Sequence, residues 1–175
     1  AQFEAFAATG LQLDHADAHK HMHLHPTVGR MMIRIGREFG LRAVRVPAEP
    51  PAVMEACGVA RSLGASAMHA GTRVLRAQLR RAGLAANDQV FGLAWSGHMT
   101  ERRLLDLIPH LPDGVSEIYF HPASRRDAAI AALMPDYDHV GELDALLSQA
   151  VRAALSGIPC IAYGDLGSGL PGPLS

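Results

Sequence analysis

Histidines recur at every second position of one short segment, beside an acidic residue. The residues are Asp17, His19, His21, His23 and His25, and a proline follows at position 26. A period of two is typical of a β-strand, whose alternate side chains project from the same face. Imidazole nitrogens and a carboxylate on one face are the ligand types that divalent ions use in proteins. The spacing therefore predicts a metal site, with Mg²⁺ or Zn²⁺ as the ion.

Other interpretations of this histidine run stay open. In a helix, each histidine would lie beside the one four positions later, although Asp and His are mediocre helix formers and proline interrupts helices. The run can also be a structural polar cluster or a surface tract. Same-face neighbours on a strand lie about 7 Å apart, so only two of the histidines reach one ion. We predict that His19 or His21, or both, ligate the metal and that His23 contacts substrate.

Three further residues fall at the ends of predicted strands or in the loops that follow them. Arg45 is a fixed cation that suits the binding of a substrate oxygen, although it can equally be a surface arginine. His121 titrates near neutral pH and can donate a proton to a leaving amine; a structural histidine in a loop is the alternative. We assign Asp17 and His121 to catalysis, and Arg45, His23 and His98 to substrate binding.

The composition is that of a soluble globular protein. The chain has 175 residues, of which 49% are hydrophobic and 19% charged, and its net charge is −1. The basic residues form no long block, so we expect no nucleic-acid partner. No apolar run approaches the roughly 20 residues that span a bilayer, and no secretory signal is present. The two cysteines lie far apart in the sequence, and we expect a cytoplasmic location.

Strand and helix patterns alternate along the chain, and these elements must position the candidate residues. Strands are predicted at residues 13–24, 41–46, 90–95, 115–120 and 158–163. Helices are predicted at residues 1–10, 26–39, 53–82 with a break near Gly64 or Gly71, 100–110 and 140–155. Such alternation is typical of βαβ units with a parallel sheet. Ligands bind such sheets outside the carboxyl ends of the strands, which is where the candidate residues fall.

Four motifs follow one another in a distinctive order. They are Asp17-Ala18-His19-Lys20-His21-Met22-His23, Arg45-Val46-Pro47-Ala48-Glu49, Glu117-Ile118-Tyr119-Phe120-His121-Pro122 and Tyr163-Gly164-Asp165-Leu166. In order and spacing they resemble the motifs of the YdjC-like carbohydrate deacetylases, and within that family those of the hopanoid-biosynthesis-associated, HpnK-like branch. The first and third motifs are the specific ones. The fourth departs from the more usual Tyr-Arg-Asp of the family.

The resemblance implies a parallel β/α barrel, a divalent metal ion, and removal of an N-acetyl group from an amino sugar or glycolipid such as an N-acetylglucosaminyl hopanoid. It places the family's metal histidine on His19, with His21 next to it, and the histidine of the His-Pro motif on His121. The Asp-Asp pair of the family's N-terminal region is absent from this sequence. We therefore expect a barrel that lacks its N-terminal strands, with residues 1–166 as one domain and 167–175 as a flexible tail.

The expected function is that of an enzyme, a metal-dependent carbohydrate deacetylase. One alternative is an amidohydrolase-type metal hydrolase, which also places a His-x-His pair at a strand end. Another is a catalytically incomplete fragment that binds metal. The expected partner is a small-molecule amino-sugar or glycolipid substrate. Because proteins cover or pair open strand edges, we also expect a homo-oligomer.

Overall fold

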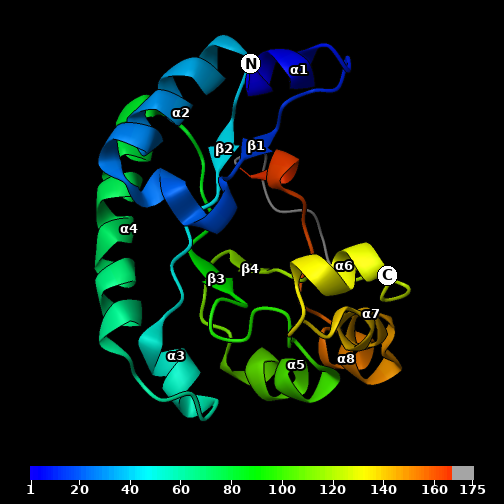
Figure 1. Cartoon of the computed structure of the whole chain (residues 1–175). Helices are drawn as coiled ribbons and strands as arrows, with labels where there is room; N and C mark the ends of the chain where they lie inside the picture. The colour runs from blue at the N-terminus through cyan, green and yellow to red at the C-terminus, as the bar shows by residue number, and fades with distance from the viewer. Residues whose placement is uncertain (167–175) are drawn as a thin grey trace. The chain divides into compact units, whose positions relative to one another are not determined.

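The computed structural model describes residues 1–166, apart from the side chain of residue 65, and these residues form two compact units (Figure 1). The first unit comprises Ala1–Ala48, Leu63–Asp88 and the described residues from Pro159 onward. The second comprises Glu49–Ser62 and Gln89–Ile158. Each unit is therefore assembled from segments that are far apart in the sequence. The tail predicted at 167–175 lies outside the described residues.

The first unit combines helices with one short parallel strand pair. Its elements are α1 (Gln2–Ala7), β1 (His15–Ala16), η1 (His19–Leu24), α2 (Pro26–Glu38), β2 (Ala43–Val44), α4 (Leu63–Ala82) and η3 (Tyr163–Asp165), where η marks a 3₁₀ helix. Strands β1 and β2 pair in parallel, with His15 opposite Ala43, and a parallel bridge joins Ala43 to Ala85. Helices α2 and α4 pack side by side in this unit.

Local signals explain where α2 begins and ends. Pro26 occupies its first turn, where the missing N–H costs nothing, and the His25 side chain accepts a hydrogen bond from the Thr27 N–H at 3.3 Å. Gly40, with a φ of 82°, stops the helix. A Cβ at Gly36 would lie 2.5 Å from the side chain of Leu41, so glycine there lets the chain return closely beside the helix. The predicted helix at 26–39 is confirmed.

The core of the first unit lies between these helices and the strands. Its buried members are Ile33, Leu41, Val44, Val46, Ala48, Leu75 and Leu79. A fully buried aliphatic side chain contributes about 1.5–3 kcal/mol relative to its exposed state. The histidine segment therefore packs against α2 and α4, and Arg45 lies between two residues of this core.

The histidine segment is not the strand that its alternation predicts. Strand β1 ends at Ala16, and His19–Leu24 forms 3₁₀ turns. Lys20 and His21 have φ values of 49° and 55°, in the left-handed region that costs non-glycine residues about 1–2 kcal/mol each. This kink brings His23 into the interior, where its ring is fully buried. The prediction of Asp17, His19, His21 and His23 on one strand face is therefore wrong.

The second unit surrounds another short parallel pair with helices. Its elements are α3 (Pro51–Ala56), β3 (Gln89–Phe91), α5 (Glu101–Leu107), η2 (Ile108–His110), β4 (Ser116–Ile118), α6 (Ala128–Leu133), α7 (His139–Leu147) and α8 (Gln149–Ala154). Val90 of β3 lies opposite Glu117 of β4. Thr100 caps α5 by accepting a hydrogen bond from the Arg103 N–H at 3.4 Å, as its sequence position predicts.

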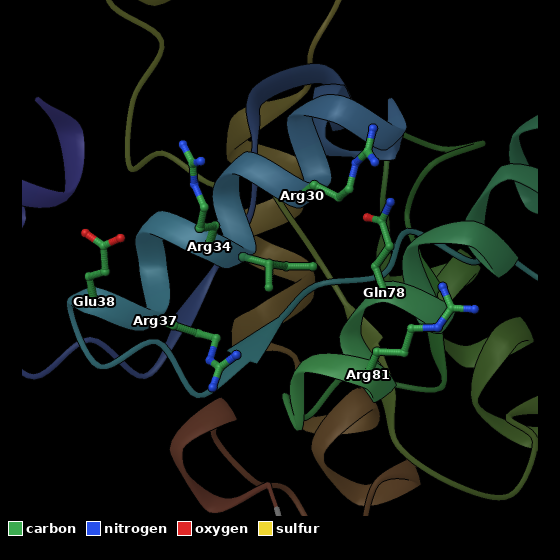
Figure 2. A pocket seen from close by; sticks show the side chains of 7 residues that line it. Arg30, Arg34, Arg37, Glu38, Gln78 and Arg81 are labelled. Atoms are coloured by element: carbon green, nitrogen blue, oxygen red, sulfur yellow. The ribbon is translucent and has the colours of Figure 1, made fainter.

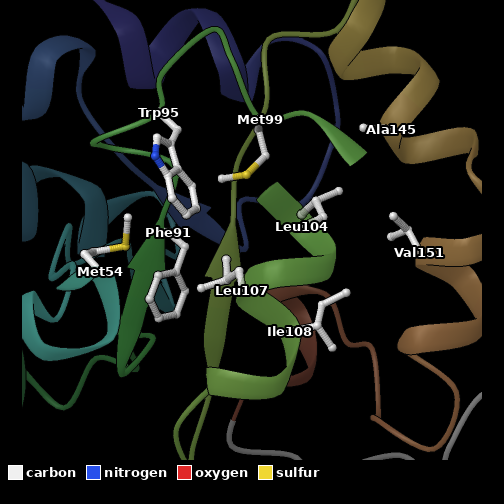
Figure 3. Packing of buried hydrophobic residues seen from close by; sticks show 9 residues of the cluster. All are labelled: Met54, Phe91, Trp95, Met99, Leu104, Leu107, Ile108, Ala145 and Val151. Atoms are coloured by element: carbon white, nitrogen blue, oxygen red, sulfur yellow. The ribbon is translucent and has the colours of Figure 1, made fainter. Parts of the chain in front are cut away.

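Aromatic, sulfur-containing and aliphatic side chains form the core of the second unit (Figure 3). The buried members are Met54, Phe91, Trp95, Met99, Leu104, Leu107, Ile108, Ala145 and Val151. They come from β3, the loop after it, and helices α3, α5, η2, α7 and α8. The loop after β3 is thus anchored at Trp95 and Met99 rather than exposed along its whole length.

Besides the histidine segment, three predicted elements differ from those observed. The helical region at 53–82 is two helices, α3 and α4, with the break at residues 57–62 rather than at Gly64 or Gly71. The helix at 140–155 is also two, because Ser148 is extended and its hydroxyl accepts a hydrogen bond from the Val151 N–H at 3.2 Å, capping α8. Residues 158–163 form no strand, and 3₁₀ helix η3 begins at Tyr163. Local capping thus overrides the longer hydrophobic patterns.

Both strand pairs are parallel, the direction that the alternation of strands and helices predicts. Each comprises two strands of two or three residues. Closure of the sheets into a barrel, and a single domain over residues 1–166, stay predictions.

Candidate functional site

Arg45 and His23 form the centre of the candidate site in the first unit. The Arg45 guanidinium forms an ion pair with the carboxylate of Asp17, and its side chain is mostly buried, at 19% exposure. The His23 Nε2 donates a hydrogen bond to the Arg45 carbonyl at 2.8 Å. Asp17 therefore binds the Arg45 side chain, and His23 binds the Arg45 backbone.

The environment of His23 favours its neutral form. A carbonyl oxygen only accepts hydrogen bonds, so Nε2 carries the ring hydrogen and Nδ1 is left as an acceptor. Nδ1 is buried and has no hydrogen-bond partner among the described residues. Burial lowers the pKa of His23 below 6.5, although the bond to Arg45 and the charge of Asp17 act in the opposite direction. His23 is therefore built into the interior as a neutral ring.

This burial gives a pH dependence of stability. Well above pH 6.5, His23 is neutral in both the folded and the unfolded chain, and its contribution to stability is complete. As the pH falls below 6.5, the unfolded chain takes up a proton that the folded chain resists, so the free energy of unfolding decreases. We expect His23→Gln to reduce this decrease between pH 7 and pH 5, measured by urea unfolding. Equal pH dependence in both proteins would contradict the assignment.

The other two histidines of the segment are more accessible than His23. His19 is exposed and His21 is half-buried, with its ring centroid 6.3 Å from that of His23. Within residues 1–166, no group of three or more His, Cys, Asp or Glu side chains is arranged to hold a metal ion. Ligation by His19 or His21 therefore stays a prediction.

Asn87 is a structural residue of the first unit that sequence reasoning missed. Its fully buried side chain accepts a hydrogen bond from the Val46 N–H at 2.7 Å and donates one to the Val46 carbonyl at 2.9 Å. The Tyr163 hydroxyl donates to the same amide oxygen at 3.3 Å. The Tyr163 ring also stacks on His15 at 4.3 Å. Asn87 thus fixes the backbone of the residue that follows Arg45. A single Asn forms no sequence pattern, so this role could not be predicted.

In the second unit, His121 follows β4 and is one-third exposed. Its backbone N–H donates to the Glu142 carboxylate, and its Nδ1 lies 4.0 Å from Glu142 Oε2. The Tyr137 ring contacts the imidazole edge to face, with centroids 5.0 Å apart. Burial lowers the pKa of His121, and the Glu142 charge opposes that effect. An imidazole in this setting can exchange a proton near neutral pH, as the catalytic assignment requires.

A second carboxylate shapes the turn after β3. Glu49 accepts hydrogen bonds from three successive backbone N–H groups, those of Gly92, Leu93 and Ala94, each at 3.0 Å. Burial raises the pKa of Glu49, while these three bonds favour its charged form. Gly92 has a φ of 117°, and a Cβ there would lie 2.9 Å from the Tyr119 carbonyl, so glycine is required. Glu49 therefore stabilises the start of the loop that carries His98.

Comparison with known proteins places these residues in a family. Residues 1–157 match the family described as YdjC-like protein. The chain belongs to the YdjC-like protein family. A carbohydrate deacetylase of Mus musculus is 29% identical over an alignment of 185 positions, gaps included, which covers 90% of this chain and 57% of the relative. The chain thus spans just over half the length of that relative. No solved structure matches the chain.

The family match includes all of the predicted site residues. Asp17, His23, Arg45 and His121 all lie within residues 1–157 of the YdjC-like chain, whereas Tyr163 lies beyond them. None of the helices formed by residues 1–166 has the length and apolar content needed to cross a membrane. The structure brings Asp17, His23 and Arg45 together in the first unit, while His98 and His121 belong to the second.

His98 lines a cavity of the second unit of this YdjC-like chain. The cavity has a volume of about 640 Å³ and also involves Trp95, Arg103 and Asp106. The Arg103 guanidinium lies 5.4 Å from the centroid of the Trp95 ring and donates to the His98 carbonyl at 2.6 Å. The His98 ring itself is exposed, so a role in substrate contact stays a prediction.

A separate cavity lies on helices α2 and α4 of the first unit (Figure 2). It measures about 590 Å³ and is lined by Arg30, Ile33, Arg34, Arg37, Glu38, Gln78 and Arg81. None of the predicted catalytic, substrate or metal residues is among them. This arginine-lined cavity is therefore not part of the candidate site in either unit.

Proposed function

We propose that this YdjC-like chain takes part in the hydrolysis of an N-acetyl group from a carbohydrate. The observation that carries the proposal is the similarity to a carbohydrate deacetylase over 90% of the chain. The substrate that we propose is a small amino sugar or a glycolipid, such as an N-acetylglucosaminyl hopanoid. Because the relative is considerably longer, the chain can act in this reaction either alone or as part of a longer catalytic unit.

Deacetylation requires two proton transfers, and two of the predicted residues can carry them out. Water adds to the amide carbonyl and loses a proton, the C–N bond breaks, and the amine nitrogen gains a proton as it leaves with acetate as the other product. We assign the proton for the amine to His121, whose imidazole is partly accessible. We assign Asp17 to the proton of the attacking water, with Arg45 holding its carboxylate.

A divalent ion, Mg²⁺ or Zn²⁺, is part of this proposal, with His19 or His21 as one of its ligands. The described residues do not make a complete ligand set, since no group of three suitable side chains occurs among them. We also propose that the active form is a homo-oligomer in the cytoplasm.

The metal proposal has a direct binding test. We expect His19→Ala to weaken zinc binding by more than about tenfold, whereas His25→Ala should leave it nearly unchanged because that side chain is used to cap α2. Isothermal titration calorimetry of the two variants and the parent chain measures the difference. Equal losses in both variants would indicate a diffuse histidine cluster instead of a site.

The proposed activity is tested by acetate release. The chain is incubated with N-acetylglucosamine oligomers and with an N-acetylglucosaminyl glycolipid, with and without added Mg²⁺ or Zn²⁺, and acetate and free amine are measured together. Equal amounts of both products support the proposal. Metal binding without turnover, both by this chain and by a longer chain extended to the length of the relative, would favour a metal-binding role.

A further inference from the structure

A buried carboxylate connects His121 to the loop that follows β3. The Glu142 side chain on α7 is only 1% exposed. Among residues 1–166, His121 is its only ion-pair partner, with 4.0 Å between Oε2 and the imidazole Nδ1. No lysine or arginine within this part of the chain neutralises it. Burying a charge raises the free energy of the folded state unless other groups form hydrogen bonds or ion pairs with it. The groups that contact Glu142 therefore indicate its role.

Backbone amides supply most of that compensation. Glu142 Oε1 accepts a hydrogen bond from the Met99 N–H at 3.0 Å, and Oε2 accepts one from the His121 N–H. Met99 is fully buried and belongs to the core beside Trp95. Glu142 also lies in the first turn of α7, where the helix dipole favours a negative charge. One carboxylate therefore joins the loop after β3 to the residue that follows β4.

The other groups beside His121 are the rings of two tyrosines and of His139. Tyr119 and Tyr137 contact it edge to face, with centroid separations of 5.5 Å and 5.0 Å. His139 on α7 donates its Nδ1 hydrogen to the His121 carbonyl at 2.5 Å. The His121 Nδ1 is buried and accepts or donates no hydrogen bond within the described residues. Glu142 is thus the one acidic group that faces the imidazole in the described part of this unit.

We propose that Glu142 is the positioning residue of His121: it fixes the backbone of that histidine against the β3 loop and electrostatically favours the protonated imidazole. This inference rests on the proposed function, in which His121 gives a proton to the leaving amine. A neighbouring carboxylate favours the imidazolium by Coulomb attraction, which is strong where water is excluded. The same attraction opposes the effect of burial on the pKa of His121.

The consequence of removing the charge has a definite sign. In Glu142→Gln the opposing attraction is lost, so the pKa of His121 falls further below 6.5. A proton donor works only while it is protonated, so the alkaline limb of kcat moves to lower pH. One amide N–H₂ also replaces an acceptor oxygen, so either the Met99 or the His121 N–H loses its bond. Hydrogen-bond loss and charge loss thus act together on kcat.

The experiment is an NMR titration of the His121 ring in the parent chain, Glu142→Gln, Glu142→Asp and Asp144→Asn. Asp144 is an exposed acid on the same helix and is the matched control. We expect the pKa of His121 to fall by about half a unit or more in Glu142→Gln. It should be unchanged in Asp144→Asn and largely retained in Glu142→Asp, which keeps the charge. An unchanged His121 pKa in folded Glu142→Gln would overturn the proposal.

Two further outcomes are decided by the same set of variants. If Glu142→Gln does not fold, Glu142→Asp decides, because it keeps the charge but its shorter side chain shifts the backbone contacts. A native fold with lowered kcat supports the positioning role, and unchanged kcat overturns it. The titration needs no substrate. Lack of turnover both in this chain and in the longer chain would contradict the proposed function, while a lowered His121 pKa in Glu142→Gln would still support the coupling of these two residues.

Discussion

Replacement of His121 by alanine is expected to lower kcat for an N-acetyl sugar by about 10²–10⁴-fold, the usual contribution of a general acid or base. The proton reaches the amine as the C–N bond breaks, so the loss should fall on kcat and leave KM nearly unchanged. Steady-state acetate release, measured on the parent and variant at equal metal concentration, separates the two constants.

The matched control for this prediction is His110→Ala. His110 is an exposed histidine of the same unit, and its Nδ1 donates to the Asp106 carbonyl at 2.9 Å, outside the His121 cluster. Its removal should leave kcat within about twofold of the parent value, as expected for an exposed residue away from the chemistry. A His121 variant with unchanged kcat would remove this residue from the mechanism.

Replacement of Asn87 by alanine should cause the largest loss of stability. Both hydrogen bonds between Asn87 and the backbone of Val46 disappear, and both residues are fully buried. Each buried group left without a partner costs about 1–3 kcal/mol, which gives roughly 2–6 kcal/mol for the pair. That is a large part of the roughly 5–15 kcal/mol that typically stabilises a domain.

Urea unfolding followed by circular dichroism measures this loss for the Asn87 variant. Gln149→Ala is the control, because it truncates an exposed amide at the start of α8. That control should change the free energy of unfolding by no more than about 0.5 kcal/mol. A similarly small change in Asn87→Ala would show that water replaces the amide, and would remove Asn87 from the support of Arg45.

Elements with strong local signals could be predicted from the sequence. Pro26 and Gly40 delimit α2, and Thr100 caps α5, since each acts through its own backbone or its nearest neighbours. The histidine segment could not be predicted in this way. Its period of two suits a strand, but the left-handed backbone of Lys20 and His21 depends on where His23 is buried. Burial of that ring against Arg45 involves residues distant in the sequence.

In the site too, residues marked by a local motif could be predicted, and residues that act through contacts with distant segments could not. The place of His121 shortly after β4, with two residues between them, follows from the His-Pro sequence that ends a strand. Glu142 could not be recognised, because an acid in the first turn of a helix is common and is usually exposed. Glu49 and Asn87 likewise act on backbone groups of other segments, and no spacing within the sequence marks such contacts.

The division into two units also sets an order for folding during synthesis. The second unit has all of its residues once Ile158 has been made, whereas the first unit still lacks its segment from Pro159 onward. The first unit includes the earliest segment but needs Tyr163 against His15 and Asn87. The N-terminal segment therefore waits longest for its final contacts. Shielding by the ribosome or a chaperone would matter most for the first unit.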